Sequence, residues 1–388
     1  MVMSGTEKML RDRGHDVAVM AMRYPDNIES SWQRYFPAEV SFGGGVSAMW
    51  RAFNRMMGRG DVVECCERLL NDFAPDVVHL HNIHSYLSPV VARLAHERGC
   101  RVVWTLHDYK LVCPSYSMLL NGVPCERCLT DANAVVKERC MKGSLVAGIA
   151  ARIESLRWNR RVLEAVTDAF VCPGNFMREM MIKGGFSADK LYVLHNFIDE
   201  ERASLIKESK PSVQRGSHCC YVGRLSHEKG VDTLLDAVKS MPDIHLKVVG
   251  GGALEQTYRE RYGKCRNIEF SGQCTPVEAV KHVMSARCMV IPSVWYENNP
   301  LSVIEALCAG TPVVGAHIGG IPELIDVTSG VTFTAGDVKS LSEALSGAMA
   351  RDWDNASIST AALAKFGIEN HYRRLMAIYS AHSILTGE

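Results

Sequence analysis

The sequence contains no apolar run long enough to cross a membrane, no excess of charge of one sign and no low-complexity tract. A membrane-spanning helix needs about 20 consecutive apolar residues, so none is expected. Residues 1–16 lack the apolar stretch of a secretory signal, which favours a cytoplasmic protein. Lysine plus arginine equals aspartate plus glutamate, 43 against 43, so no overall field indicates nucleic acid as a partner.

The composition is that of an ordinary globular protein with enough apolar material for large cores. The chain has 388 residues, of which 47% are hydrophobic and 22% charged. A chain of this length favours two or three domains. In a cytoplasmic protein the 14 cysteines are expected to be thiols or metal ligands rather than disulfides.

Short runs rich in valine, isoleucine and leucine alternate with longer segments of helical period. The runs lack polar alternation, so both faces of each sheet are expected to be covered. Strands that alternate with helices predict right-handed crossovers and parallel sheets. The predicted strands are residues 16–22, 76–82, 101–108, 169–174, 191–196, 219–224, 245–251, 268–272, 288–293, 312–317 and 330–334.

A polar segment with proline and glycine, residues 206–217, separates two series of strands and is interpreted as a linker. The sequence therefore predicts an α/β fold with two doubly wound, Rossmann-like domains, residues 1–200 and 201–365, and a cleft between them. Residues 366–388 have apolar residues near helical spacing and are expected to pack back on the first domain. Ligands of such sheets lie beyond the carboxyl ends of the strands.

The segment VWYENNPLSVIEALCAGTPVVG, residues 294–315, is predicted to run from a loop into a helix and on to the next strand. Asn299 is a candidate helix cap, and Pro300 suits the first helical position because its missing N–H costs nothing there. Gly310 is placed to end the helix in the left-handed conformation.

This geometry gives the two glutamates of the segment different surroundings. Glu297 lies in the loop, whereas Glu305 lies about one and a half turns into the helix. The free N–H groups of Leu301 and Ser302 and the helix dipole form an anion site. The segment therefore predicts a phosphate pocket flanked by carboxylates that accept hydrogen bonds from hydroxyls, as a nucleotide-diphosphate sugar requires.

The spacing of Glu297 and Glu305 resembles the E-x7-E signature of glycosyltransferase family 4 (group 1), whose retaining enzymes have the GT-B fold. The resemblance covers nearly the whole chain. It implies transfer of a sugar from a nucleotide-diphosphate sugar to a saccharide or lipid-linked acceptor, with retention, in bacterial surface or exopolysaccharide assembly. It also implies catalysis without a metal or other cofactor, because basic side chains take over the charge role.

Further residues acquire roles from the same resemblance. Residues 221–238 look like the donor-phosphate segment of the family, in which Arg224 and Lys229 grip the diphosphate. Two cations at a strand end suit the stabilisation of such a leaving group. Gly250 belongs to the segment "VVGGG", in which glycines allow a ligand to approach the backbone closely. Gly272 belongs to the segment "FSGQ", which resembles the turn that contacts the nucleobase in members of the family.

The two glutamates also receive roles from the resemblance. Glu297 would hold the donor sugar and Glu305 the ribose, with Asn299, Leu301 and Ser302 completing the donor site. Among these residues Glu297, Arg224 and Lys229 are also expected to take part in catalysis.

Several histidines follow predicted strands of the first domain. His107, in "TLHDY", matches the active-site histidine of the family, beside the donor sugar and the acceptor. His81, Asn82 and His84 follow another strand and are candidates for the acceptor side.

The amino end departs from the family pattern. Members begin with a strand and a Gly-Gly loop, whereas this chain begins with a helical segment in which Gly5 and Glu7 resemble a shortened loop. The first strand is therefore expected to be missing. Two alternatives stay open: a truncated, non-catalytic nucleotide-sugar-binding relative, and another GT-B enzyme such as a sugar-nucleotide epimerase, against which the complete E-x7-E segment argues.

An insert at residues 113–140 contains four cysteines in the symmetric pattern C-x11-C-x2-C-x11-C. Four thiolates with a C-x2-C centre suit tetrahedral zinc, which would order a loop this long. Structural zinc is favoured over ordinary thiols, and an iron–sulfur cluster is the weaker alternative. The candidate ligands are Cys113, Cys125, Cys128 and Cys140.

Residues 152–166 form a basic amphipathic segment. Most such faces are merely solvated, but in the family the first domain often docks on anionic membranes. The segment therefore predicts peripheral membrane contact, with the protein at the inner face of the membrane.

Overall fold

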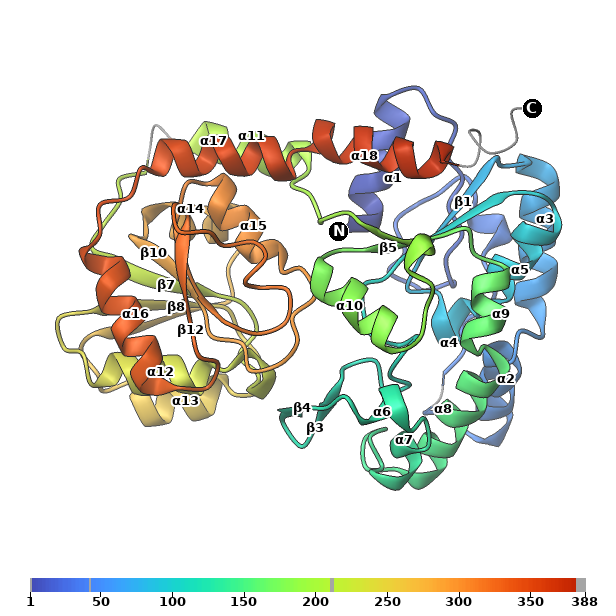
Figure 1. Ribbon diagram of the computed structural model, residues 1–388, viewed down its shortest axis with the longest axis horizontal. Coiled ribbons are helices and arrows are strands. Elements are labelled where there is room, and N and C mark those ends of the chain that lie inside the picture. Colours follow the sequence, from blue (N-terminus) through green and yellow to red (C-terminus); the bar gives the residue numbers. More distant parts are fainter. Residues whose placement is uncertain (1, 42, 210–212, 382–388) are drawn as a thin grey trace.

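Two parallel sheets organise the chain, one in each half of the sequence (Figure 1). The computed structural model describes residues 2–41, 43–209 and 213–381. Helices lie on both sides of each sheet, so the predicted fold class of two doubly wound α/β domains is confirmed (Figure 1). No helix within the described residues is both long and apolar enough to span a bilayer.

The first sheet has the strand order β1-β2-β5-β6 with every neighbouring pair parallel. Its strands are valine-rich and largely buried, as expected for a sheet covered on both faces. The carboxyl ends of these strands point toward the second domain and place their loops at the seam between the domains. The strands are β1 (Val77–His81), β2 (Arg101–Thr105), β5 (Ala169–Cys172) and β6 (Leu191–Val193).

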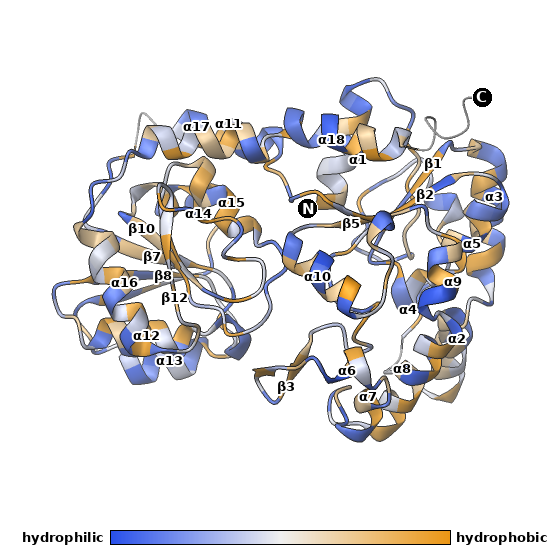
Figure 2. Ribbon diagram, in the orientation of Figure 1, coloured by the Kyte–Doolittle hydropathy of each residue, from blue (hydrophilic) through white to orange (hydrophobic). Residues whose placement is uncertain are grey.

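The second sheet has the order β12-β11-β10-β7-β8-β9, again with parallel neighbours. Figure 2 shows hydrophobic residues along the central strands of this sheet, which form the core of the domain. Its strands are β7 (His218–Val222), β8 (His245–Val249), β9 (Ile268–Gly272), β10 (Cys288–Ile291), β11 (Val313–Ala316) and β12 (Gly330–Phe333).

Helices and short 3-10 turns connect the strands. The helices are α1 (Val2–Asp12), α2 (Val46–Met56), α3 (Asp61–Phe73), α4 (His84–Leu87), α5 (Val90–Glu97), α6 (Arg127–Thr130), α7 (Ala134–Lys137), α8 (Leu145–Arg157), α9 (Arg160–Ala165), α10 (Asn175–Lys183), α11 (Glu200–Ser209), α12 (Val231–Lys239), α13 (Glu255–Tyr262), α14 (Pro276–Ser285), α15 (Leu301–Cys308), α16 (Val338–Ala350), α17 (Asn355–Phe366) and α18 (Ile368–Ser380). The 3-10 turns are η1 (Gln33–Tyr35), η2 (Ala188–Lys190) and η4 (His227–Lys229).

One predicted strand is wrong, and one small element was not predicted. Residues 16–22 form no strand, because no described strand pairs with them and an extended segment without a ladder gains no sheet hydrogen bonds. The cysteine-containing insert also holds a small hairpin, β3 (Leu119–Leu120) with β4 (Val123–Pro124), that its sequence did not reveal.

The chain crosses between the domains at two places that lie side by side. After β6, Ile198 forms a parallel bridge with Gly367, and its N–H donates to the carbonyl of Phe366 at 2.9 Å. Of the predicted linker, residues 206–209 belong to α11, and residues 210–212 lie outside the described residues.

The terminal helix α18 lies against the first domain (Figure 1). Arg101 donates to the carbonyl of Ile378 at 2.8 Å, and His79 shares a hydrogen bond of 2.7 Å with the hydroxyl of Tyr379. The last residues of the predicted helical segment, 382–388, lie outside the described residues.

Candidate active site

The loop that follows β10 lies on the seam between the domains and contacts the first domain directly. The side-chain amide of Asn298 donates to the carbonyl of Leu106 at 2.8 Å. Asn299 accepts from the N–H of Asn196 at 2.9 Å, and the Asn196 amide donates back to the Asn299 carbonyl at 2.8 Å. The two asparagines therefore hold the loop against the strand ends of the first sheet.

The local prediction for the start of α15 is wrong in one detail. Pro300, in an extended conformation, occupies the cap position, and no side chain caps the helix. Asn299 is engaged across the seam instead, where its side-chain oxygen accepts from the backbone N–H of Asn196 in the other domain. Gly310 adopts the predicted left-handed conformation, with φ of 76°.

Glu297 is the best-anchored acidic residue of this loop. Its side chain is buried, and one carboxylate oxygen lies 2.7 Å from Nζ of Lys229 and accepts from the hydroxyl of Ser293 at 2.8 Å. The Lys229 ammonium also lies 5.4 Å from the centre of the Trp295 ring. The structure thus brings together Glu297 and Lys229, which are 68 positions apart in the sequence.

Arg224 lies five positions before Lys229 in the sequence but is not part of the Glu297–Lys229 cluster. Its side chain is 71% exposed, and its guanidinium is 3.5 Å from Glu228. Its backbone carbonyl accepts from the hydroxyl of Tyr221 at 2.6 Å, which fixes the strand end. The guanidinium is therefore free to swing toward a ligand at low cost.

Gly250 shows why a glycine is needed after β8. Its φ is 130°, and an added Cβ would lie 2.0 Å from the carbonyl oxygen of Gly223. Its N–H donates to the carbonyl of Gly272, which also has a positive φ of 73°. The two glycines that the sequence singled out are thus joined where the strand ends of β7, β8 and β9 meet.

Glu305 is paired with a cation that the sequence reading missed. Its carboxylate lies 2.9 Å from the guanidinium of Arg202, at the start of α11. Burial raises the pKa of Glu305, and the charge of Arg202 opposes that rise. A small cavity beside the pair is lined by Leu301 of α15 and by Gly5 of α1, so the amino-terminal helix reaches this side of the site.

Ser302 lies in the first turn of α15, next to Leu301. Glu7 was predicted, with Gly5, to belong to a shortened loop at the amino end. Its carboxylate forms an ion pair of 3.0 Å with Arg11 of its own helix.

His107 is held by a second histidine. Its Nε2 lies 2.8 Å from Nδ1 of His81, and the two rings are stacked with centres 5.2 Å apart. Burial lowers the pKa of His107 to about 4 and holds the pKa of His81 well below its usual value. Both rings are therefore neutral at physiological pH, so one of them donates the shared hydrogen bond and the other accepts it.

The two other candidates near β1 have different surroundings. His84 lies 3.1 Å from Asp108. Burial by itself raises the pKa of Asp108, but the hydrogen bond with His84 and further donors bring it below its usual value. Asn82 is exposed, with a positive φ of 47°.

Two further seam residues, Tyr296 and Glu323, were not predicted. The hydroxyl of Tyr296 donates to Glu126 of the cysteine-containing insert at 2.9 Å, and its ring lies 4.7 Å from that of Phe176. Glu323 accepts from two N–H groups at the start of α10, those of Asn175 and Phe176, each at 2.5 Å. No motif marks these residues, because their partners come from distant parts of the chain.

The predicted zinc site is not supported. Within the described residues no three histidine, cysteine or acidic side chains are placed to hold a metal ion. Cys113 is buried and lies 3.1 Å from the hydroxyl of Ser115, while Cys125 precedes α6 and Cys140 follows α7. A hydrogen bond with Cys128 lowers the pKa of the Cys113 thiol to about 6. Cys113, Cys125 and Cys140 all raise the pKa of the Cys128 thiol, so the four thiols lie in one region, but no three of them are placed as metal ligands within the described residues.

Sequence comparisons assign both halves of the chain to related families. The profile of Glycosyltransferase Family 4 matches residues 6–202, and that of Glycosyl transferases group 1 matches residues 204–364. The chain is 25% identical over 268 residues to an uncharacterized 42.6 kDa protein in the cps region of Klebsiella pneumoniae, covering 69% of this chain and 64% of that protein. It is 25% identical to the O-antigen biosynthesis glycosyltransferase WbnH of Escherichia coli, covering 43% of this chain and 46% of that protein. The chain thus spans less than two thirds of the length of these curated relatives.

Solved structures share the fold. Anabaena Alr3699/HepE in complex with UDP-glucose has a TM-score of 0.59 at 18% identity, covering 90% of this chain and 87% of that one. Sucrose-phosphate synthase from Thermosynechococcus elongatus has a TM-score of 0.65 at 16% identity, covering 98% of this chain and 92% of that one. The two-domain arrangement of the chain is therefore that of the GT-B structures.

Proposed function

Because the chain belongs to glycosyltransferase family 4, we propose that it transfers a sugar from a nucleotide-diphosphate sugar to a saccharide or lipid-linked acceptor. The buried Glu297–Lys229 pair carries the proposal, since its atoms lie at the carboxyl ends of the second sheet and beside the first domain. A carboxylate and an ammonium held together there match a donor that has sugar hydroxyls next to a diphosphate.

The diphosphate is bound by positive groups from two elements. Lys229 and the flexible Arg224 approach it from the loop after β7, and the N–H groups of Leu301 and Ser302 approach it from the start of α15. These groups offset the negative charge that builds up as the diphosphate leaves. Glu305, anchored by Arg202, accepts from the ribose hydroxyls.

The sugar itself lies between Glu297 and His107 in this proposal. Retention follows a front-side route, in which the leaving phosphate accepts the proton of the acceptor hydroxyl. Glu297 is held by Lys229 and Ser293, and His107 by His81, so both groups are oriented before the substrate arrives.

Relatives support a role in the assembly of surface polysaccharide. One is described as an O-antigen biosynthesis glycosyltransferase, and another as a protein of the cps region. A third, 30% identical over 136 residues, is the phosphatidyl-myo-inositol mannosyltransferase of Mycobacterium leprae. We infer that the chain acts at the inner face of the membrane, where such acceptors are lipid-linked.

Helix α8 supports membrane contact. Apolar side chains that are exposed recur at helical spacing along it, and in Figure 2 the helix lies at the margin of the molecule. Arginines on α8 and α9 flank the surface and complement anionic headgroups. The exposed side chains are those of Leu145, Val146, Ile149, Ile153 and Leu156.

A thermal-shift panel with UDP, GDP, ADP and their common sugars tests the donor site. At a hundredfold excess over the dissociation constant, binding adds about 2.7 kcal/mol to the free energy of unfolding. One nucleotide is expected to raise the melting temperature, and Glu305→Ala to abolish the rise, while Glu343→Ala on the exposed face of α16 leaves it intact. A folded protein that responds to no nucleotide would refute the proposal. Donor binding without transfer to any acceptor would favour the non-catalytic alternative.

A further inference from the structure

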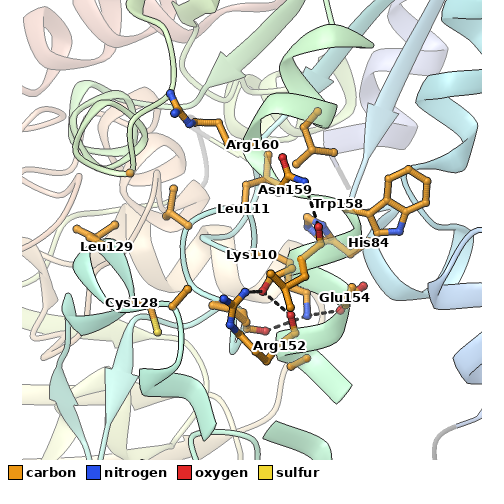
Figure 3. A pocket seen from close by; sticks show the side chains of 18 of the residues that line it. His84, Lys110, Leu111, Cys128, Leu129, Arg152, Glu154, Trp158, Asn159 and Arg160 are labelled. Atoms are coloured by element: carbon orange, nitrogen blue, oxygen red, sulfur yellow. Dashed lines mark hydrogen bonds and ion pairs between the residues drawn. The ribbon is translucent and has the colours of Figure 1, made fainter. Parts of the chain in front are cut away.

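A cavity of about 300 Å³ lies within the first domain, apart from the donor-site residues. Three segments line it: residues 110–114 after His107, residues 128–132 of the insert, and the α8–α9 region. Figure 3 shows side chains of these segments around the cavity. Its size is at the lower end for small-molecule sites.

A buried ion pair lies in the wall of this cavity. Nζ of Lys110 lies 2.9 Å from Oε2 of Glu154, and Oε1 of Glu154 accepts from the hydroxyl of Ser85 at 2.8 Å. Both charged side chains are largely buried. A pair of this kind contributes little net stability, because desolvation of the two charges opposes their attraction. Charged groups in a cavity wall are instead typical of ligand sites.

The wall carries an excess of positive charge. Arg152 donates to the neutral groups of Asn133, at 2.8 Å, and Ser155, at 3.2 Å, so no ion pair cancels its charge within the described part of the chain. Arg160 lies at the other end of the cavity and is 4.0 Å from Glu164 (Figure 3). With Lys110 balanced by Glu154 and Arg160 by Glu164, the guanidinium of Arg152 favours a ligand with a phosphate group.

The rest of the wall is apolar and leads to the outer surface. Leu111, Leu129 and Leu163 line the cavity, and so does Leu156, which also belongs to the exposed apolar surface of α8. An apolar path thus continues from the cavity to that surface.

The cavity is linked to the proposed active site on two sides. His84 lines it and contacts Asp108, the neighbour of His107. Cys128 of the insert also lines it, two positions after Glu126, which holds Tyr296 of the donor loop. The wall of the cavity is therefore connected to both loops of the proposed active site.

We propose that this cavity binds a single-chain lipid phosphate, with the phosphate at Arg152 and the chain along the leucines toward α8. The proposal rests on the proposed function, because the lipid phosphate would be the anchored end of the acceptor.

The test measures binding of farnesyl phosphate to the full chain by the fluorescence of Trp158, which lines the cavity and donates to the carbonyl of Met56 at 2.8 Å. Farnesyl phosphate is expected to change the emission of the wild type, and Trp158→Phe to remove that change. Farnesol and inorganic phosphate are expected to bind about tenfold or more weakly, because each lacks one half of the recognised chemistry.

Arg152→Gln is expected to weaken farnesyl phosphate binding at least about tenfold. Arg373→Gln on exposed α18 is the matched control and leaves binding unchanged. Equal binding of farnesol, equal binding of inorganic phosphate, or full binding by Arg152→Gln would each overturn the proposal. The nucleotide thermal shift of the same variants reports separately on the donor site, so a failure there is distinguishable.

Discussion

Nζ of Lys229 lies 2.7 Å from Oε1 of Glu297, and the carboxylate that it contacts is 7% exposed. A loop after β7 and a loop after β10 are thereby joined at the carboxyl edge of the second sheet. Because β7 and β10 are neighbouring parallel strands, their loops emerge side by side, which explains how residues so distant in sequence meet.

Glu297→Gln keeps the shape of the side chain and removes the charge that positions Lys229. We expect kcat to fall about a hundredfold, since a group oriented toward the developing charge is displaced. Nucleotide release coupled to sugar transfer measures the effect, with Glu343→Gln as the exposed control. A variant within twofold of the wild type would show that the pair is only structural.

His81 orients His107 through the 2.8 Å hydrogen bond between their rings. We expect His81→Phe to lower kcat about tenfold with little change in KM, because the His107 ring loses its fixed orientation. His81→Asn retains a hydrogen-bonding side chain and is expected to recover part of the loss. A pH–rate profile of both variants separates orientation from general loss of fold, and equal activity of His81→Phe and the wild type would disprove the role.

Glu323 joins the domains by accepting two N–H groups at the start of α10. A carboxylate at a helix start contributes about 1 kcal/mol, so Glu323→Ala is expected to lower the free energy of unfolding by that amount. Denaturant titration measures it. The exposed Glu343→Ala is expected to cause no comparable loss. If both variants unfold alike, the contact across the seam is energetically neutral.

Histidines buried beside one another make stability depend on pH. Burial lowers the pKa of His79 to about 3 and that of His107 to about 4. Below pH 6.5, near the usual value for histidine, the unfolded chain binds protons that the folded chain excludes. The free energy of unfolding should therefore fall as the pH drops from about 6.5 toward 4, by a few kcal/mol in total.

Urea unfolding at several pH values measures this slope. His79→Gln is expected to reduce the slope, and the exposed His96→Gln to leave it unchanged. A slope that is the same in His79→Gln and in the wild type would contradict the assignment.

Chelation is expected to leave the fold intact. Since the described residues provide no three-ligand metal site, treatment with EDTA should not change the melting temperature. Elemental analysis of the untreated protein is the companion measurement. Stoichiometric zinc together with a fall in melting temperature after chelation would restore the cysteine-site hypothesis.

The sequence predicted most of the strands because parallel strands buried on both faces are almost continuously apolar. It failed at residues 16–22, which have the same composition but pair with no described strand. The apolar pattern reports burial, whereas a strand also requires a neighbour to supply hydrogen bonds, and the pattern contains no information about that neighbour.

The residues of the candidate site likewise include some that a local sequence pattern predicts and others that it does not. Lys229 and Glu297 belong to recognisable motifs, so the sequence predicted a role for each of them. It did not predict that the two side chains contact each other. Arg202, Tyr296 and Glu323 act through partners on other elements, and such pairings depend on the three-dimensional arrangement alone. Asn299 was misplaced for a related reason: its helix-capping preference is local, and a contact with the other domain overrides it.

The bridge between Ile198 and Gly367 joins the two interdomain crossings into one double-stranded connection. Two parallel segments that are joined by a bridge resist twisting and sliding better than a single segment does. Rotation about the bridge between Ile198 and Gly367 is therefore expected to be the easiest relative motion of the two domains. Cleavage of either crossing alone would still leave the domains attached through the other.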